Sequence, residues 1–208
     1  MSTNQSFTTL TAKVRAELKV RGSRFIGTAI PVQAREEVAA ELGAIRKEFW
    51  DASHNCYAYR MAPDGLSYRF SDDGEPSGSA GKPILFVMQQ KELVNALVVV
   101  TRYFGGTKLG VGGLVRAYTE AAQAALALGE LQVKYQTDTV RIFTPYEDMS
   151  VVRALVERYA VHFEEEFRDV VSYVMTLRSD QFEEFSAVLT DISQGRAGLI
   201  RVDPITIP

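Results

Sequence analysis

The stretch ALVVVTRYFGGTKLGVGGLVRAYTEA, residues 96–121, combines three features that decide how the N-terminal part of the chain folds. Residues 96–103 are nearly all apolar and rich in valine, which predicts a central strand buried on both faces. Residues 112–128 are rich in alanine and are followed by a glycine, which predicts a helix. Between the two, glycines and Lys108 let a partner approach the backbone, and a helix N-terminus exposes N–H groups and partial positive charge. The stretch therefore predicts an anion site.

The known phosphate-binding motifs do not fit this region. The P-loop pattern fails because the chain's one Gly-Lys pair, residues 81–82, is followed by Pro83 where a Ser or Thr is needed. The dinucleotide-binding pattern also fails, because the spacing that begins with Gly110 and Gly112 places Val115 at the third glycine position. A nucleotide site here would need a different architecture.

A second loop, SDDGEPSGSAGKP at residues 71–83, is rich in glycine, serine and acidic side chains. Its three carboxylates are those of Asp72, Asp73 and Glu75. They could hold a hard cation such as Mg²⁺, which prefers oxygen ligands. Alternatively, Asp-Gly and Ser-Gly pairs build successive turns, and the carboxylates cap backbone N–H groups or meet Arg69, Arg102 or Lys108. We favour the structural or recognition role, because the spacing matches no defined metal loop.

His54 and Cys56 are the remaining candidates for chemistry. They are two residues apart on a predicted strand, so their side chains share a face and suggest a Cys-His nucleophile. Side chains at this spacing stand side by side, however, and a lone cysteine is more often a small buried hydrophobe. We therefore predict no catalytic residue. Tyr57 and Tyr59 alternate on the same strand and are expected to pack in the core, because no basic cluster interleaves them.

Composition and charge restrict the class of protein. With 46% hydrophobic and 24% charged residues, the 208-residue chain is expected to be globular, with one large or two small cores. Residues 1–130 carry 15 Lys and Arg against 13 Asp and Glu, whereas residues 131–208 carry 8 against 13. A nucleic-acid surface therefore belongs in the N-terminal part, since such surfaces are basic.

The location of the protein follows from what the sequence lacks. The apolar run at residues 93–100 is far shorter than the roughly 18 residues needed to span a bilayer. The N-terminus has neither the basic start nor the apolar middle of a secretory signal. A single cysteine cannot form an intrachain disulfide. We expect a cytoplasmic protein.

The remaining N-terminal elements follow from local patterns. Alternation predicts two strands within residues 14–31 around a turn at residues 21–23, and helical spacing predicts a helix at residues 34–49. A strand is expected at residues 54–62, then a turn at residues 63–65, a partner strand at residues 66–70 and a helix from Ile84.

From Thr137 onward the pattern changes to strand, helix, strand, strand, helix, strand. A βαββαβ order in about seventy residues is the ferredoxin-like pattern. The fold class is therefore α+β with two domains, at residues 1–132 and 133–208.

Four motifs resemble those of the IMPACT family and its bacterial YigZ branch. In chain order they are SRFIGTAIPV, DASHNCYAYR, SDDGEPSGSAGKPI and VVVTRYFGGTKLGVGGLVRAY, which lie within residues 23–118. The resemblance implies an N-terminal domain with the fold of a ribosomal-protein domain, shared with domain IV of elongation factor G and a class of small-molecule kinases. It implies that the ferredoxin-like C-terminal domain is similar to domain V of the same factor.

The resemblance also implies a function. Eukaryotic members regulate translation by binding a protein activator of a starvation-responsive kinase. For bacterial members the resemblance implies no settled biochemical activity and suggests association with RNA or the ribosome. We therefore expect a non-enzymatic, translation-related binding protein that contacts RNA, the ribosome or a protein factor and needs no cofactor. The alternative is a Mg²⁺-dependent enzyme that binds a nucleotide or phosphate ligand. The expected binding residues are His54, Asp72, Asp73, Glu75, Lys82, Arg102, Gly105, Gly106, Lys108, Gly112, Gly113 and Arg116.

Overall fold

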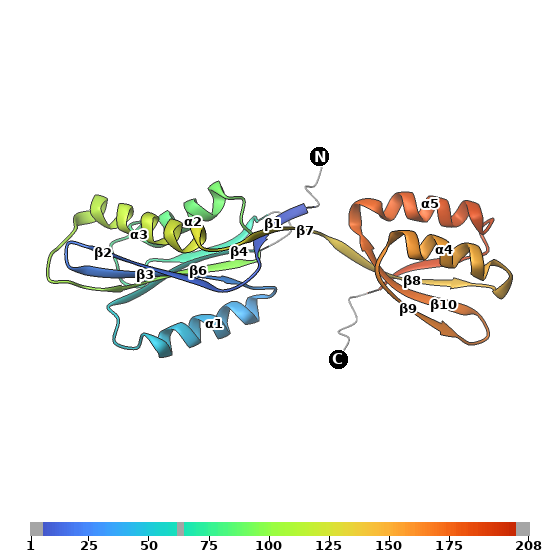
Figure 1. Ribbon diagram of the computed structural model, residues 1–208, viewed down its shortest axis with the longest axis horizontal. Coiled ribbons are helices and arrows are strands. Elements are labelled where there is room, and N and C mark those ends of the chain that lie inside the picture. The colour runs from blue at the N-terminus through green and yellow to red at the C-terminus, as the bar shows by residue number, and fades with distance from the viewer. Residues whose placement is uncertain (1–5, 62–64, 203–208) are drawn as a thin grey trace. The chain divides into compact units, whose positions relative to one another are not determined.

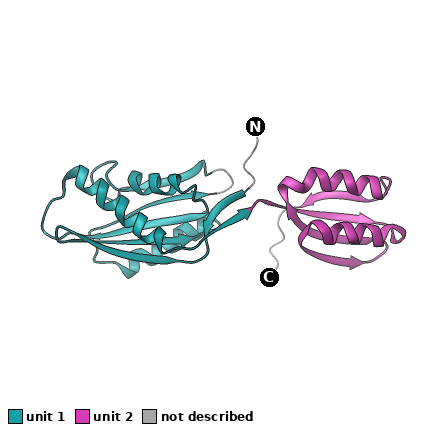
Figure 2. Ribbon diagram, turned by 45° about the horizontal axis from the view of Figure 1, so that its top comes forward, with its two compact units in different colours: residues 1–134 teal, residues 135–208 magenta. Residues whose placement is uncertain are grey.

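The computed structural model describes residues 6–61 and 65–202. It divides into two compact units, residues 1–134 and residues 135–208 (Figure 2). Among the described residues, no helix has the length and apolar character needed to cross a membrane.

The first unit is built around a five-stranded sheet in which every neighbouring pair is antiparallel. The strand order is β2 (Val14–Val20), β3 (Ser23–Pro31), β6 (Ala96–Tyr103), β4 (His54–Met61) and β5 (Ser67–Ser71). The helices are α1 (Arg35–Glu48), α2 (Gly81–Gln90) and α3 (Gly110–Ala127). Helix α1 covers one face of the sheet, and α2 and α3 cover the other (Figure 1).

Strand β6 lies at the centre of this sheet and separates two apolar layers. Leu97 and Val99 pack on the side of α1, whereas Val98 and Val100 pack on the side of α2 and α3. All four side chains are fully buried. A strand covered on both faces needs apolar residues at consecutive positions, which is why this segment reads as an unbroken run. The structure thus confirms the buried central strand.

The first unit also shows where local patterns placed helix boundaries wrongly. Helix α3 begins at Gly110, two residues before the predicted start, so the connecting loop is only residues 104–109. Helix α2 begins at Gly81, inside the loop expected at residues 71–83. The predicted turn at residues 63–65 lies largely outside the described residues.

A small two-stranded sheet was not predicted. Strand β1 (Ser6–Leu10) pairs with β7 (Leu131–Tyr135), which follows α3 after a short turn. The partner strands are more than a hundred residues apart in the sequence, and both are short. Neither segment alone signals its pairing.

The second unit has one four-stranded antiparallel sheet in the order β11, β8, β10, β9. Its elements are β8 (Thr137–Thr144), α4 (Met149–Tyr159), β9 (Ala160–Phe167), β10 (Val171–Arg178), α5 (Phe182–Ile192) and β11 (Gly198–Val202). Two single 3₁₀ turns, Tyr146–Asp148 and Ser179–Gln181, precede the helices. Both helices pack on one face of the sheet over a separate core (Figure 1). The element order is the one expected from the sequence.

Candidate binding site at two glycine-rich loops

Asp72 organises the acidic loop from within. Its Oδ1 accepts hydrogen bonds from the backbone N–H groups of Ala80 and Gly81 at 3.0 and 2.8 Å, and its Oδ2 accepts one from Gly78 at 2.8 Å. Two of these donors lie at the start of α2, where a carboxylate offsets unpaired N–H groups and the helix dipole. Asp72 therefore caps α2 from eight residues away, which explains the early start of that helix.

Asp73 ties the same loop to strand β4. Its Oδ2 accepts a hydrogen bond from the backbone N–H of Asn55 at 2.7 Å, and its Oδ1 lies 3.5 Å from Nη2 of Arg46. The ring Nδ1 of His54 lies 2.8 Å from the backbone oxygen of Asp73. These contacts join the loop to the end of the sheet nearest the second glycine-rich loop.

Glu75 of the acidic loop and Arg102, near the end of β6 that leads into the second loop, form a buried ion pair. Glu75 is 9% exposed and Arg102 is 5% exposed. Nη1 of Arg102 lies 2.6 Å from Oε1 of Glu75, and the hydroxyl of Tyr118 donates to the same oxygen at 2.8 Å. Nε2 of His54 lies 3.9 Å from this oxygen. Arg102 is thus held below the open surface by a partner from the other loop.

Cys56 lies beneath the acidic loop and is fully buried. Its Sγ is 3.0 Å from the backbone oxygen of Asp72 and 3.4 Å from the Tyr118 hydroxyl. Burial raises the pKa of the Cys56 thiol to about 12 and also raises the pKa of Tyr118. Since the thiolate is the reactive form, a thiol that stays protonated is a poor nucleophile. Cys56 is a packing residue.

Two glycines bring the second loop against the β2–β3 turn. A Cβ added to Gly105 would lie 1.9 Å from the backbone carbon of Gly22, so no other residue fits there. Ser23 reinforces this contact, because its Oγ accepts a hydrogen bond from the Gly105 N–H at 3.1 Å and lies 3.3 Å from Nη2 of Arg102. The β2–β3 turn is therefore part of the site, although the sequence alone did not place it there.

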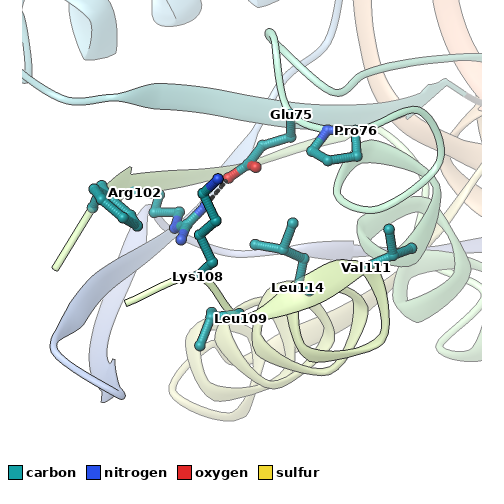
Figure 3. A pocket seen from close by; sticks show the side chains of 9 residues that line it. Glu75, Pro76, Arg102, Lys108, Leu109, Val111 and Leu114 are labelled. Carbon is teal, nitrogen blue, oxygen red and sulfur yellow. Dashed lines mark hydrogen bonds and ion pairs between the residues drawn. The ribbon is translucent and has the colours of Figure 1, made fainter. Parts of the chain in front are cut away.

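A pocket of about 260 Å³ opens between the two loops, and we call it the α3 pocket. Charged side chains on its wall are those of Glu75, Arg102 and Lys108, and the rest is formed by Pro76, Phe104 and the first turns of α3. Figure 3 shows Lys108 extending from the loop toward the side where Glu75 and Arg102 lie, with Leu114 and Val111 on the helix side. The pocket thus joins the predicted acidic and glycine-rich loops.

A second hollow, of about 190 Å³, adjoins the first. Arg21, Arg116 and Glu120 line it, and Leu109 lines both hollows. Arg116 and Lys108 are exposed, so each hollow has an exposed cation at its wall, Lys108 from the loop and Arg116 from α3.

The other predicted site residues lie at different places. Lys82 is exposed in the first turn of α2 and lines neither hollow. Gly106 is exposed in the β6–α3 loop at φ +85°, where a side chain would be strained. Gly112 and Gly113 belong to the first turn of α3 and not to the loop.

Metal ligation finds no support in the arrangement of the acidic loop. The described residues contain no group of three or more His, Cys, Asp or Glu side chains placed to hold a metal ion. Asp72 directs both carboxylate oxygens at backbone donors, and Glu75 is engaged by Arg102. The geometry of this loop favours a scaffold.

Sequence reasoning missed three residues of the site. Tyr118 was read only as part of a helix, yet its hydroxyl reaches both Glu75 and Cys56. Ser23 was assigned to a turn, and Phe104 was not considered although it is half-exposed at the pocket and lies over Arg102. A conspicuous signal existed only for Phe104, an aromatic residue directly before two glycines.

The fold and the site define a mixed α/β protein of two compact units with a pocket at the N-terminus of a helix. A sequence profile of the Impact N-terminal domain matches residues 21–126. An IMPACT family member of Haemophilus influenzae is 36% identical over 183 residues, which are 86% of this chain and 89% of that protein. The IMPACT family member YigZ of Escherichia coli is 32% identical over 195 residues, 92% of this chain and 96% of that protein.

A solved structure also resembles this chain. It is described as "Crystal structure of an hypothetical protein" and superposes with a TM-score of 0.71 at 32% sequence identity, covering 96% of this chain and 98% of the other. The protein belongs to the IMPACT family, as its four sequence motifs indicated.

Proposed function

We propose that this protein is a non-enzymatic binding protein that acts in translation, by contacting RNA, the ribosome or a protein factor. The observation that carries the proposal is the surface formed by the two glycine-rich loops. The buried pair of Glu75 and Arg102 holds this region together inside the protein, and the α3 pocket lies between the two loops at the surface. Such a surface is held in shape before a partner arrives, which reduces the ordering cost of binding.

The exposed charges of this surface favour an anionic partner. Lys108 and Arg116 are exposed beside the two hollows, and the N-terminus of α3 adds its partial positive charge. The acidic side chains of the first loop are already engaged within the protein, since Glu75 pairs with Arg102, Asp73 lies 3.5 Å from Arg46 and Asp72 accepts hydrogen bonds from backbone N–H groups. RNA, alone or in the ribosome, is the anionic partner that the proposed role in translation supplies.

Membership of the IMPACT family supports the translational part of the proposal. The family resemblance implies regulation of translation for eukaryotic members and association with RNA or the ribosome for bacterial ones. As part of the same proposal, residues 1–132 form the IMPACT-type domain related to domain IV of elongation factor G, and residues 133–208 form a ferredoxin-like domain. We also place the protein in the cytoplasm.

The proposal is tested by capture from a bacterial lysate, with and without nuclease. The wild type is compared with Lys108→Ala/Arg116→Ala and with the charge-matched control Lys47→Ala/Lys91→Ala, whose lysines are exposed elsewhere in the same unit. We expect ribosomal subunits, RNA or an identified translation factor with the wild type and the control, and a marked loss with the first double variant.

Where capture depends on RNA, salt dependence adds a second readout. Removing two phosphate contacts should lower the slope of log affinity against log salt by about two. Recovery of neither ribosomal material nor a translation factor by the wild type would show that the proposal is wrong.

A further inference from the structure

The α3 pocket has an end suited to an anion. Helix α3 has 18 residues, and its N-cap residue, Leu109, makes no side-chain capping hydrogen bond. The N–H groups of Gly110, Val111 and Gly112 have no acceptor within the helix, and no hydrogen bond from them to another described residue is formed. Together with the helix dipole and the adjacent Lys108, they would favour a phosphate at this end.

An independent feature of the same pocket points to a missing partner. Arg102 lines the pocket and is 5% exposed, yet its Nε has no hydrogen-bond partner among the described residues. Buried polar groups are rarely left without a partner, since this costs free energy. Its Nη1 and Nη2 each donate to a partner, Glu75 and Ser23, whereas Nε donates to none of the described residues.

Gly112 is a third indication, because the fold does not require a glycine there. Its φ is not in the left-handed region, and a Cβ added to it would have no atom within 4 Å. Glycine inside a helix is unfavourable relative to alanine. Gly43 in α1 shares these features, so what distinguishes Gly112 is its position beside the free N–H groups at the start of α3, where the absence of a side chain leaves the backbone open.

The rest of the pocket is apolar and contains an exposed aromatic ring. Phe104 is 50% exposed and Val111 is 58% exposed. Phe104 also packs over the Arg102 guanidinium, with 5.5 Å between the guanidinium carbon and the ring centroid. Nucleic-acid bases stack on such rings irrespective of sequence. The volume, about 260 Å³, lies just below the range of roughly 300–1,000 Å³ found for drug-sized ligands. It suits one small ligand unit.

We propose that the α3 pocket binds one nucleotide, with its phosphate at the first turn of α3 beside Lys108 and its base against Phe104. The nucleotide is either a free nucleotide or one unit of single-stranded RNA, since both present the same phosphate and base. This inference rests on the proposed binding function and deepens it by naming the ligand chemistry.

The proposal is tested on the full chain with four probes: inorganic phosphate, adenosine, AMP and a five-nucleotide single-stranded RNA. Affinity is followed by NMR shifts of the backbone amides of Gly110, Val111 and Gly112. We expect AMP or the RNA to shift these amides at lower concentration than phosphate or adenosine, because only the first two present a phosphate and a base together. Tighter binding of AMP would identify the ligand as a free nucleotide, and tighter binding of the RNA would identify it as one unit of single-stranded RNA.

Two glycine variants separate binding from stability. Gly112→Ala should raise Tm, because it removes a helical glycine, and should weaken the preferred probe about tenfold or more by blocking the N–H groups. Gly43→Ala is the matched control, since it also lies in a helix with open space around its Cβ. It should raise Tm and leave affinity unchanged.

Several outcomes would overturn the nucleotide site. They are the absence of amide shifts with every probe at millimolar concentration, equal affinity for phosphate and AMP, and unchanged affinity in Gly112→Ala. The outcome of the NMR experiment is independent of the outcome of the lysate experiment. Nucleotide binding without capture of RNA, ribosomes or a translation factor would leave the pocket assigned and the translational function rejected, whereas capture without nucleotide binding would do the reverse.

Discussion

At the scale of single residues, the site depends on Glu75. This carboxylate accepts hydrogen bonds from Arg102 and Tyr118, and both Glu75 and Arg102 are removed from solvent. Two buried charges of opposite sign compensate each other, whereas removing one of them leaves an unpaired buried charge, which is strongly destabilising. The pair therefore holds the two loops together without adding net charge to the pocket.

Replacing Glu75 by glutamine tests this pairing. Glu75→Gln keeps the shape but leaves the Arg102 charge uncompensated, and should lower the free energy of unfolding by about 3–5 kcal/mol. The matched control is Glu17→Gln, because Glu17 pairs with Arg24 on the surface, where solvent screens the pair and its loss should change stability little. Denaturant unfolding followed by circular dichroism measures both. Equal effects of the two variants would contradict the role of burial.

Cys56 gives the protein a pH dependence at the alkaline end. Its pKa is raised to about 12 by burial, whereas the unfolded thiol ionises near pH 9. Between these values the folded protein binds more protons than the unfolded one, so stability decreases as pH rises. One such group contributes a slope of about 1.4 kcal/mol per pH unit.

The variant Cys56→Ser removes the titrating thiol and keeps a donor for the backbone oxygen of Asp72. We expect the decline in unfolding free energy above pH 9 to become shallower than in the wild type, with little change in its pH dependence at neutral pH. Urea unfolding at half-unit steps from pH 7 to pH 10.5 measures the slope. Parallel curves for the two proteins would show that Cys56 does not titrate as proposed.

At the scale of elements, the start of α2 depends on a side chain outside the helix. Asp72 accepts hydrogen bonds from the N–H groups of Gly78, Ala80 and Gly81. The helix therefore begins where the acidic loop folds back on it, although its first residues, Gly-Lys-Pro, contain no apolar period.

Replacing Asp72 tests whether its carboxylate stabilises the start of α2. Asp72→Ala should lower the free energy of unfolding by about 1–3 kcal/mol and accelerate hydrogen exchange at the amides of Ala80 and Gly81. Asp72→Asn should have an intermediate effect, because one oxygen acceptor remains. Ser77→Ala, in the exposed part of the same loop, serves as the control. Unchanged exchange at both amides in Asp72→Ala would rule out the cap.

At the scale of the whole molecule, the two units have separate apolar cores. The clusters around β6 contain no residue of the second unit, and the cluster under α4 and α5 contains none of the first. Residues 1–134 include β1 and all of its partner β7 except Tyr135, so a fragment ending there keeps both strands of this small sheet. We therefore expect each unit to fold alone.

We predict that a fragment of residues 1–134 folds cooperatively and retains the amide spectrum of the site loops. In the full chain, Ile142→Ala should destabilise only the second unit, because Ile142 is fully buried in its core. The expected cost is about 2–5 kcal/mol. Calorimetry and amide NMR spectra measure both effects. A fragment that does not fold, or a variant that lowers the stability of both units equally, would contradict independent units.

The sequence by itself determined the elements whose signal is local and strong. The valine-rich run of β6, the helical spacing of α1 and the βαββαβ order of the second unit were all predicted and are observed. Such patterns report burial of one or both faces of an element, which each segment carries in its own residues. The two glycine-rich loops were likewise recognised as a pair from composition and family motifs.

Only the tertiary structure decided which side chains of those loops remain available. The sequence left open whether the loop carboxylates hold a cation, cap backbone N–H groups or meet Arg69, Arg102 or Lys108. In the fold Glu75 pairs with Arg102 inside the protein, and Asp72 caps a helix. The contacts of Ser23 and Tyr118 likewise join segments more than forty residues apart. No local pattern encodes them, because hydrogen bonding and burial depend on which distant segments the fold brings together.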